Sequence, residues 1–143
     1  MTPLFDHEKL EVYQDSLLFC RWAGGVISEI RVKAAAKDQL DRASTSIPLN
    51  IAEGNGKFSR RDRARFFEIA RGSALECAAC LDVLVVRGLT DAERIRSGKE
   101  QLFHIVRMLI GLLRRFSERG ESLREDGGVY CQEQDYELEQ EEK

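Results

Sequence analysis

Proline and histidine are scarce in this chain, with two of each among 143 residues. So few prolines favour long helices, because proline is the residue that most strongly breaks a helix. So few histidines, with no paired nucleophile and base, argue against an enzyme that works by acid–base or nucleophilic chemistry. We therefore expect a helical protein that is not an enzyme and that needs no cofactor.

A membrane span and an export signal are also missing. No apolar run approaches the roughly 18 residues that are needed to cross a bilayer, and residues 1–6 lack a basic region followed by an apolar core. The four cysteines do not form a disulfide framework in a chain of this size and helical pattern. The expected location is a reducing cytoplasm, with no contact to a membrane.

Four stretches with apolar residues at spacings of three and four predict four amphipathic helices. The first runs from about His7 to about Lys33, and its Gly24-Gly25 pair indicates either a close helix contact or a break. A short link at residues 31–37 leads to the second helix. The core-facing residues expected on these two helices are Leu10, Tyr13, Leu17, Cys20, Ile27 and Ile30, then Leu40, Ala43, Ile47 and Ile51.

Capping boxes mark the starts of the other two helices. Residues 59–62 open the third helix, which is slim around residues 72–79 and ends at Gly88, and residues 90–93 open the fourth, which ends at Gly120. The expected core faces are Phe66, Ile69, Ala70, Ser73, Cys77, Cys80, Leu81 and Leu84, then Ile95, Leu102, Val106, Leu109, Leu113 and Phe116.

These helices and short links predict an all-α, antiparallel up-and-down four-helix bundle without a sheet, over residues 1–120. The remaining residues, 121–143, form a tail with nine acidic and two basic residues, a net charge of −7. Such a composition is typical of disorder, although a short helix at residues 132–141 also fits. Residues 1–120 carry +4, so the overall charge of −3 does not argue against nucleic acid as a partner.

The second helix contains Pro48 inside a continuous apolar stripe. A proline there removes one backbone N–H and crowds the carbonyl four residues earlier, at roughly 3 kcal/mol. The hydroxyls of Ser44, Thr45 and Ser46 are placed to satisfy the freed backbone groups. We interpret the stretch as a structural joint, with a binding surface as the alternative. Its polar stripe and expected helix stop consist of Arg42, Ser46, Asn50 and Glu53, followed by Gly54 and Gly56.

The densest positive charge comes directly after this joint. Its members are Lys57, Arg60, Arg61, Arg63 and Arg65, offset by Asp62 to a local charge of +4. A helix N-terminus and the fork of arginine donors both suit phosphate groups, so this segment is the predicted nucleic-acid-binding site. The alternative is a solvated helix face that pairs with acidic residues of a neighbouring subunit or of the tail.

The cysteines and histidines of this sequence do not have the spacing of a metal site. Cys77 and Cys80 form a Cys-x-x-Cys pair on the core face of a helix, where cysteine is a small apolar residue. A zinc ion needs two further ligands. Glu100 and His104 lie one helical turn apart, which is not the Glu-x-x-His spacing of metal-binding bundles.

Residues 5–117 resemble the 23S rRNA intervening-sequence protein family, often described as four helix bundle proteins. The resemblance rests on Leu10 to Gln14, Gln39 to Ala43, the Ser-Ile-Pro…Asn-Ile-Ala-Glu-Gly string of Ser46 to Gly54, and Phe66 to Glu76. It implies an antiparallel four-helix bundle that assembles as a homopentamer, and no catalytic activity. Some members are encoded within 23S rRNA genes, and a distant relative is the retroelement accessory protein that binds a reverse transcriptase and nucleic acid.

Two functions fit these observations. In the first, the protein forms a homo-oligomer, a pentameric ring, that associates with rRNA or another RNA through the basic segment. The second is an oligomeric adaptor or scaffold for a protein partner, such as the accessory type that serves a reverse transcriptase, without direct RNA binding. Added salt separates the two, because phosphate binding weakens steeply with salt.

Overall fold

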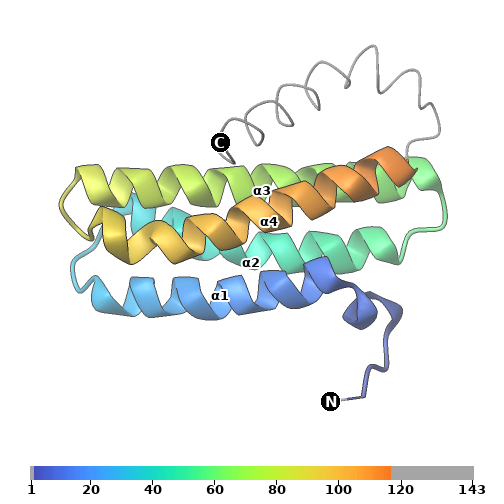
Figure 1. The fold of residues 1–143 in the computed structure, drawn as a ribbon, viewed down its shortest axis with the longest axis horizontal. Coiled ribbons are helices and arrows are strands. Elements are labelled where there is room, and N and C mark those ends of the chain that lie inside the picture. The colour runs from blue at the N-terminus through green and yellow to red at the C-terminus, as the bar shows by residue number, and fades with distance from the viewer. Residues whose placement is uncertain (1, 117–143) are drawn as a thin grey trace, which may run out of the picture.

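Four antiparallel helices form a bundle in the computed structural model, which describes residues 2–116 (Figure 1). A short 3-10 helix, η1 (Asp6–Lys9), precedes α1 (Glu11–Glu29), α2 (Ala35–Asn55), α3 (Arg60–Val86) and α4 (Ala92–Phe116). Residues 2–116 contain no strand, so the prediction of an all-α up-and-down bundle without a sheet is confirmed. Residue 1, the predicted stop at Gly120, the acidic tail and its possible short helix lie outside the described residues.

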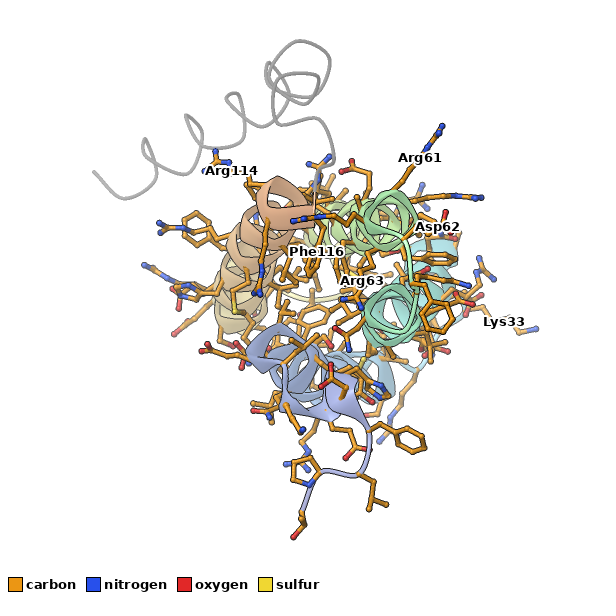
Figure 2. The ribbon with its side chains drawn as sticks, turned by 90° about the vertical axis from the view of Figure 1, so that its right-hand side faces the viewer. Lys33, Arg61, Asp62, Arg63, Arg114 and Phe116 are labelled. Atoms are coloured by element: carbon orange, nitrogen blue, oxygen red, sulfur yellow. The ribbon has the colours of Figure 1, made fainter. Side chains whose placement is uncertain are left out.

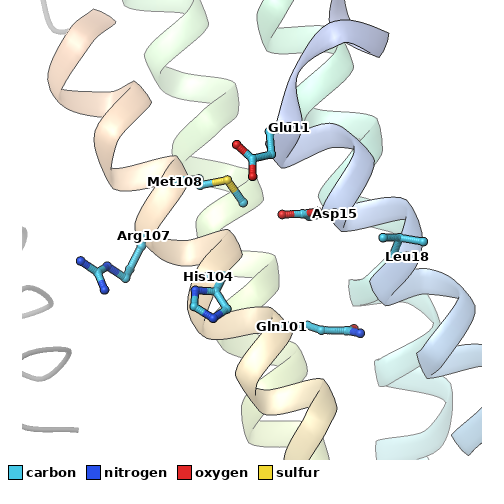
Figure 3. A pocket seen from close by; sticks show the side chains of 7 residues that line it. All are labelled: Glu11, Asp15, Leu18, Gln101, His104, Arg107 and Met108. Atoms are coloured by element: carbon cyan, nitrogen blue, oxygen red, sulfur yellow. The ribbon is translucent and has the colours of Figure 1, made fainter. Parts of the chain in front are cut away.

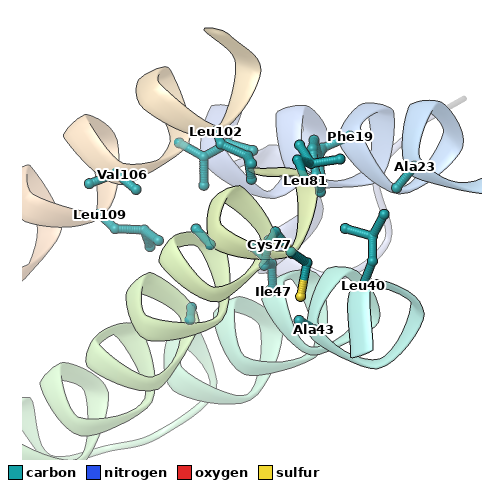
Figure 4. Packing of buried hydrophobic residues seen from close by; sticks show 14 of the residues in the cluster. Phe19, Ala23, Leu40, Ala43, Ile47, Cys77, Leu81, Leu102, Val106 and Leu109 are labelled. Carbon is teal, nitrogen blue, oxygen red and sulfur yellow. The ribbon is translucent and has the colours of Figure 1, made fainter. Parts of the chain in front are cut away.

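The core lies between the four helices, and each of them contributes buried residues to it (Figure 4). All the apolar residues predicted for α2 are buried, and so are those predicted for α4 except Phe116, which is half-buried. In α3 the prediction was partly wrong, because Phe67 is buried where Phe66 and Ile69 were expected. Ile69 is 42% exposed. The buried residues labelled in Figure 4 are Phe19, Ala23, Leu40, Ala43, Ile47, Cys77, Leu81, Leu102, Val106 and Leu109.

The predicted core face of α1 was only partly right. Ile30 is buried as predicted, and Leu10, Tyr13 and Ile27 are half-buried against the core. The fully buried residues of the helix itself are Val12, Ser16, Phe19, Ala23 and Val26, a stripe displaced by about one residue from the predicted one. Because Ser16 is polar, the spacing of apolar residues does not reveal this stripe. Ser16 is nevertheless fully buried, since its hydroxyl donates to the Tyr13 carbonyl at 2.6 Å. Leu17 and Leu18 are consequently 45% and 53% exposed.

The bounds of α1 also differ from the prediction. The helix begins at Glu11 because Leu10 has an extended backbone, and it ends at Glu29 rather than near Lys33. Lys37 Nζ donates to the Ile30 carbonyl at 2.6 Å and so ties the turn to α2.

Close helix contact occurs at glycines other than the predicted pair. The helix continues through Gly24 and Gly25, so there is no break. A Cβ at Gly24 would meet nothing within 4 Å, and one at Gly25 would meet only the end of the Arg94 side chain, at 3.5 Å, so the pair makes no close contact with another backbone. In α4, an ideal Cβ on Gly98 would lie 2.1 Å from Cη2 of Trp22. The indole of α1 therefore packs directly against the backbone of α4.

Helix α2 passes through Pro48 without ending. The carbonyl left without its usual N–H partner is that of Ser44, and the Cys20 thiol of α1 donates to it at 3.2 Å. The Ser44 and Thr45 hydroxyls donate instead to the Asp41 carbonyl, at 3.0 and 2.9 Å, so their predicted role was wrong. A sulfur donor on a neighbouring helix thus stabilises the proline position.

The predicted helix stop at Gly54 and Gly56 is right for Gly56 and wrong for Gly54. Helix α2 continues through Gly54 and ends at Asn55, with Gly56 as its C-cap. Gly54 is buried inside α2, where an added Cβ would come within 2.8 Å of the Phe66 Cβ. Its role is to let α3 approach α2.

The predicted capping residues of α3 and α4 are nearly right. Ser59 caps α3, since its hydroxyl accepts from the Asp62 N–H at 3.0 Å. At α4 the cap is Asp91, one residue after the predicted Thr90, and its carboxylate accepts from the Arg94 N–H at 2.8 Å. Gly88, at φ +74°, ends α3 with a Leu89 N–H to Leu84 carbonyl bond of 2.9 Å.

Candidate nucleic-acid interface

The antiparallel topology brings the start of α3 and the last described turn of α4 to the same end of the bundle (Figure 2). Arg60 Nη2 donates to the carbonyl of Arg115 at 2.6 Å and joins the two segments. All five predicted basic residues lie just before or within the first two turns of α3, and Arg114 and Arg115 in the last described turn of α4 extend the group. Figure 2 labels Arg61, Arg63 and Arg114. We call these seven residues the cationic end: Lys57, Arg60, Arg61, Arg63, Arg65, Arg114 and Arg115.

The cationic end is strongly charged. Residues 57–65 and 114–116 carry seven basic side chains against Asp62, a formal charge of +6. At its edge, Asp6 of η1 accepts from Asn55 Nδ2 at 2.9 Å and adds one negative charge. Arg114 and Arg115 were not predicted as part of the site, although an antiparallel bundle with short links places the end of the fourth helix beside the start of the third.

Phe116 organises the guanidinium groups. Those of Arg63, Arg115 and Arg60 lie 5.2, 5.4 and 6.0 Å from the centre of its ring, within the range of cation–π attraction. The same ring packs against Phe67 with a centroid separation of 5.8 Å. The arginines are therefore positioned by an aromatic residue that is itself anchored in the core.

The remaining basic residues divide into held and extended side chains. Arg63 Nε donates to the Lys57 carbonyl at 2.7 Å, and Lys57 Nζ lies 4.9 Å from the Phe66 ring centre. Arg65 lies 6.0 Å from the same ring. Arg61 is exposed and points away from the bundle (Figure 2), so its charge faces solvent.

The polar stripe of α2 lies mainly at the contact with α3. Asn50 Nδ2 donates to the Ser46 carbonyl and hydroxyl at 2.8 and 2.9 Å, and the Ser73 hydroxyl of α3 donates to the Ser46 hydroxyl at 2.9 Å. Arg42 donates to Gln39 at 2.8 Å on the exposed side. The bond from Ser73 joins α3 to α2 near the buried Pro48, the other bonds lie within α2, and the exposed Glu53 takes part in none of them.

The three cysteines of the bundle are thiols in or near the core. Cys77 and Cys80 are buried, and Cys20 is half-buried against α2. Burial raises the pKa of all three thiols, and the pKa of Cys77 is raised further by the neighbouring Cys80 and Cys20. Reactive thiolates are therefore disfavoured at neutral pH. Within residues 2–116, no group of three or more histidine, cysteine or carboxylate side chains could hold a metal ion.

A groove of about 560 Å³ lies between residues 11–18 of α1 and 101–108 of α4 (Figure 3). Its walls carry Glu11, Asp15 and Leu18 on one side and Gln101, His104, Arg107 and Met108 on the other. Glu100 pairs instead with Arg96, at 3.2 Å. The residues that line the groove include no serine, cysteine or threonine beside the histidine.

Comparison with known proteins decides the family. The model of the family described as 23S rRNA-intervening sequence protein matches residues 8–111, well over half of the chain. The chain belongs to this family. The match covers nearly all of the bundle, including the Pro48 joint and most of the cationic end, but stops before Arg114.

The fold is also seen in a solved structure. It is a crystal structure of a protein of unknown function from the S23 ribosomal protein family of Bacteroides thetaiotaomicron. The TM-score is 0.69 at 24% identity, over 72% of this chain and 98% of that one. No curated protein matches the sequence. None of the helices within residues 2–116 is long and apolar enough to span a membrane.

Proposed function

We propose that this 23S rRNA-intervening sequence protein is a non-enzymatic RNA-binding protein that contacts RNA phosphates with its cationic end. We further propose that it is a cytoplasmic protein that assembles as a homo-oligomer, a pentameric ring. Its proposed partner is structured rRNA. The observation that carries the proposal is the convergence of the α3 start and the α4 end, held together by the bond from Arg60 to the Arg115 carbonyl.

The geometry supports phosphate binding in two ways. Arginine presents a fork of donors that matches phosphate oxygens, and five of the six arginines and lysines in residues 57–65 and 115 already lie against an aromatic ring or a carbonyl. Side chains that are positioned beforehand lose less conformational entropy on binding. In a ring, several cationic ends would act on one RNA and multiply a weak affinity.

A protein-directed adaptor is the second candidate. It is favoured by the exposure of Leu17 and Leu18 on α1, of which Leu18 lines the groove between α1 and α4. Exposed neighbouring leucines suit a contact with another protein. An adaptor of this kind would bind its partner with little dependence on salt, whereas RNA binding depends on it steeply.

The decisive test compares two double charge reversals by fluorescence anisotropy with a labelled rRNA fragment. R61E/R65E changes two exposed residues of the cationic end, whereas R31E/K33E makes the same charge change on the exposed α1–α2 link at the opposite end (Figure 1). We expect R61E/R65E to lower the RNA affinity about tenfold or more. The slope of log affinity against log salt concentration should also decrease, by the contribution of about two phosphate contacts. R31E/K33E should behave like the wild type.

Equal effects of the two variants would mean that only overall charge matters and would contradict a defined site. Binding that is insensitive to salt in the wild type would favour the adaptor. Size-exclusion chromatography with light scattering tests the assembly separately, and a single monomeric species would refute the ring.

A further inference from the structure

Phe58 is exposed to an unusual degree. It lies in the four-residue link between α2 and α3, and its relative exposure is 103%, the highest among the large apolar side chains described. Leaving a phenylalanine in water forgoes the free energy that its burial provides. Its ring therefore contributes nothing to the packing of the bundle, although it is the most prominent apolar side chain at the cationic end.

The link presents Phe58 from a fixed backbone. The Gly56 N–H donates to the carbonyls of Ala52 and Glu53, each at 3.2 Å, and the Lys57 N–H donates to the Gly54 carbonyl at 3.1 Å. The Lys57 carbonyl in turn accepts from Arg63 Nε at 2.7 Å. On the other side, Ser59 is held as the cap of α3. The exposure of Phe58 is thus a property of an anchored turn.

The other aromatic rings of this end are engaged differently. Phe66 has Lys57 and Arg65 over its ring, and Phe116 has three arginines around it. Phe58 alone projects from between Lys57 and Arg60 with its side chain in solvent. Lys57 and Arg60 precede and follow Phe58 closely in the chain, and their charges are held on neighbouring rings. An exposed aromatic ring within a cationic surface is the combination by which proteins stack an unpaired base and hold its flanking phosphates.

We propose that Phe58 stacks on an unpaired base of the RNA bound by the cationic end, so that the ligand is RNA with a loop, bulge or single strand rather than a continuous duplex. Stacked bases in a duplex offer no face to the ring, whereas an unpaired base does. The proposal rests on the proposed function, because the cations supply the phosphate contacts that bring the base to Phe58.

The test uses the full chain and two labelled RNAs that have the same number of phosphates. One is a hairpin with an unpaired loop, and the other is a blunt duplex. We expect Phe58→Ala to lower the affinity for the hairpin about tenfold and to leave the affinity for the duplex unchanged. Phe58→Trp should retain hairpin binding, since indole also stacks. R61E/R65E should weaken both RNAs. A 2-aminopurine in the loop should be quenched by the wild type and not by Phe58→Ala.

The possible failures are distinguishable. If R61E/R65E weakens both RNAs while Phe58→Ala changes neither or both equally, phosphate binding stands and stacking is overturned. If Phe58→Ala alters the size of the assembly in light scattering and leaves the quenching intact, Phe58 is a contact between copies and the inference is wrong. If the wild type binds neither RNA, the stacking and the proposed function both fail. Because Phe58 packs against nothing in the bundle, the substitution should not unfold the protein.

Discussion

A matched pair of glycine substitutions tests the packing of α1 against α4. Gly98 and Gly24 both lie inside helices, so replacing either with alanine favours the helix by up to about 1 kcal/mol. At Gly24 the new methyl group meets nothing within 4 Å. Gly24→Ala should therefore stabilise the protein.

At Gly98 the same methyl group would lie 2.1 Å from Cη2 of Trp22 and 2.2 Å from Cζ3. Carbon atoms in contact are separated by about 3.5–4.0 Å, so the indole must move by roughly 1.5 Å. The centre of the Trp22 ring also lies 5.6 Å from the centre of the Phe19 ring and 5.5 Å from Cζ of Arg94, and both contacts would loosen. Overpacking of this kind costs about 1–3 kcal/mol, which exceeds the gain in helix propensity.

We therefore expect Gly98→Ala to lower the free energy of unfolding by about 1–2 kcal/mol and Tm by about 4–8 °C. Trp22 is the only tryptophan, so its fluorescence reports directly on this contact during urea unfolding. Both variants must be measured at the same protein concentration as the wild type, because assembly makes stability depend on concentration.

A double-mutant cycle with Trp22→Leu isolates the contact. The smaller side chain should remove most of the penalty, so that Gly98→Ala becomes neutral or stabilising in that background. If Gly98→Ala stabilises the wild type as much as Gly24→Ala does, the indole does not pack on the α4 backbone and the reasoning fails.

Three further predictions concern charge and the thiols. RNA affinity should fall roughly 100-fold between 50 and 200 mM salt if the cationic end neutralises about four phosphates, and a change below threefold in binding titrations would contradict this. Deleting residues 121–143 should raise RNA affinity, because the tail carries a charge of −7 and follows the cationic end in the chain; equal affinities would show that it does not compete with RNA. The raised pKa of Cys77 favours the protonated thiol in the folded state, so its stabilising contribution is complete below about pH 9 and declines as the pH rises further. Cys77→Ala should consequently lose less stability than the wild type between pH 8 and 10 in urea titrations, whereas parallel curves would rule out this linkage.

Sequence periodicity predicted the helices best where apolar residues alone make the core face. In α4 every predicted position is buried or half-buried, since no polar residue interrupts its stripe. In α1 the stripe includes Ser16, which is buried only because its hydroxyl bonds to the preceding turn. Hydrophobicity then selects Leu17 in its place, and the predicted face is displaced by about one residue along the helix, although Ile30 at its end is buried as predicted.

Contacts between helices could not be read from one helix at a time. The importance of Gly98 depends on Trp22, which lies more than seventy residues earlier in the chain. The thiol that satisfies the Ser44 carbonyl also comes from another helix, although nearby hydroxyls were the obvious local donors. For the same reason, the basic residues of α3 were predicted as a site and those of α4 were not, because only the fold brings them together.

The position of the arginines is itself an argument about function. Three of the first four residues of α3 are Arg60, Arg61 and Arg63, yet the positive end of the helix dipole disfavours cations there by about 0.3–1 kcal/mol each. Contacts with Phe116 and with backbone carbonyls offset this for Arg60 and Arg63, but Arg61 points into solvent. A residue that opposes the stability of its own helix is typical of a functional site, where local rules are broken for binding. The R61E/R65E variant should therefore be at least as stable as the wild type while binding RNA more weakly. A loss of both properties together would mean that these arginines serve the bundle and not a ligand.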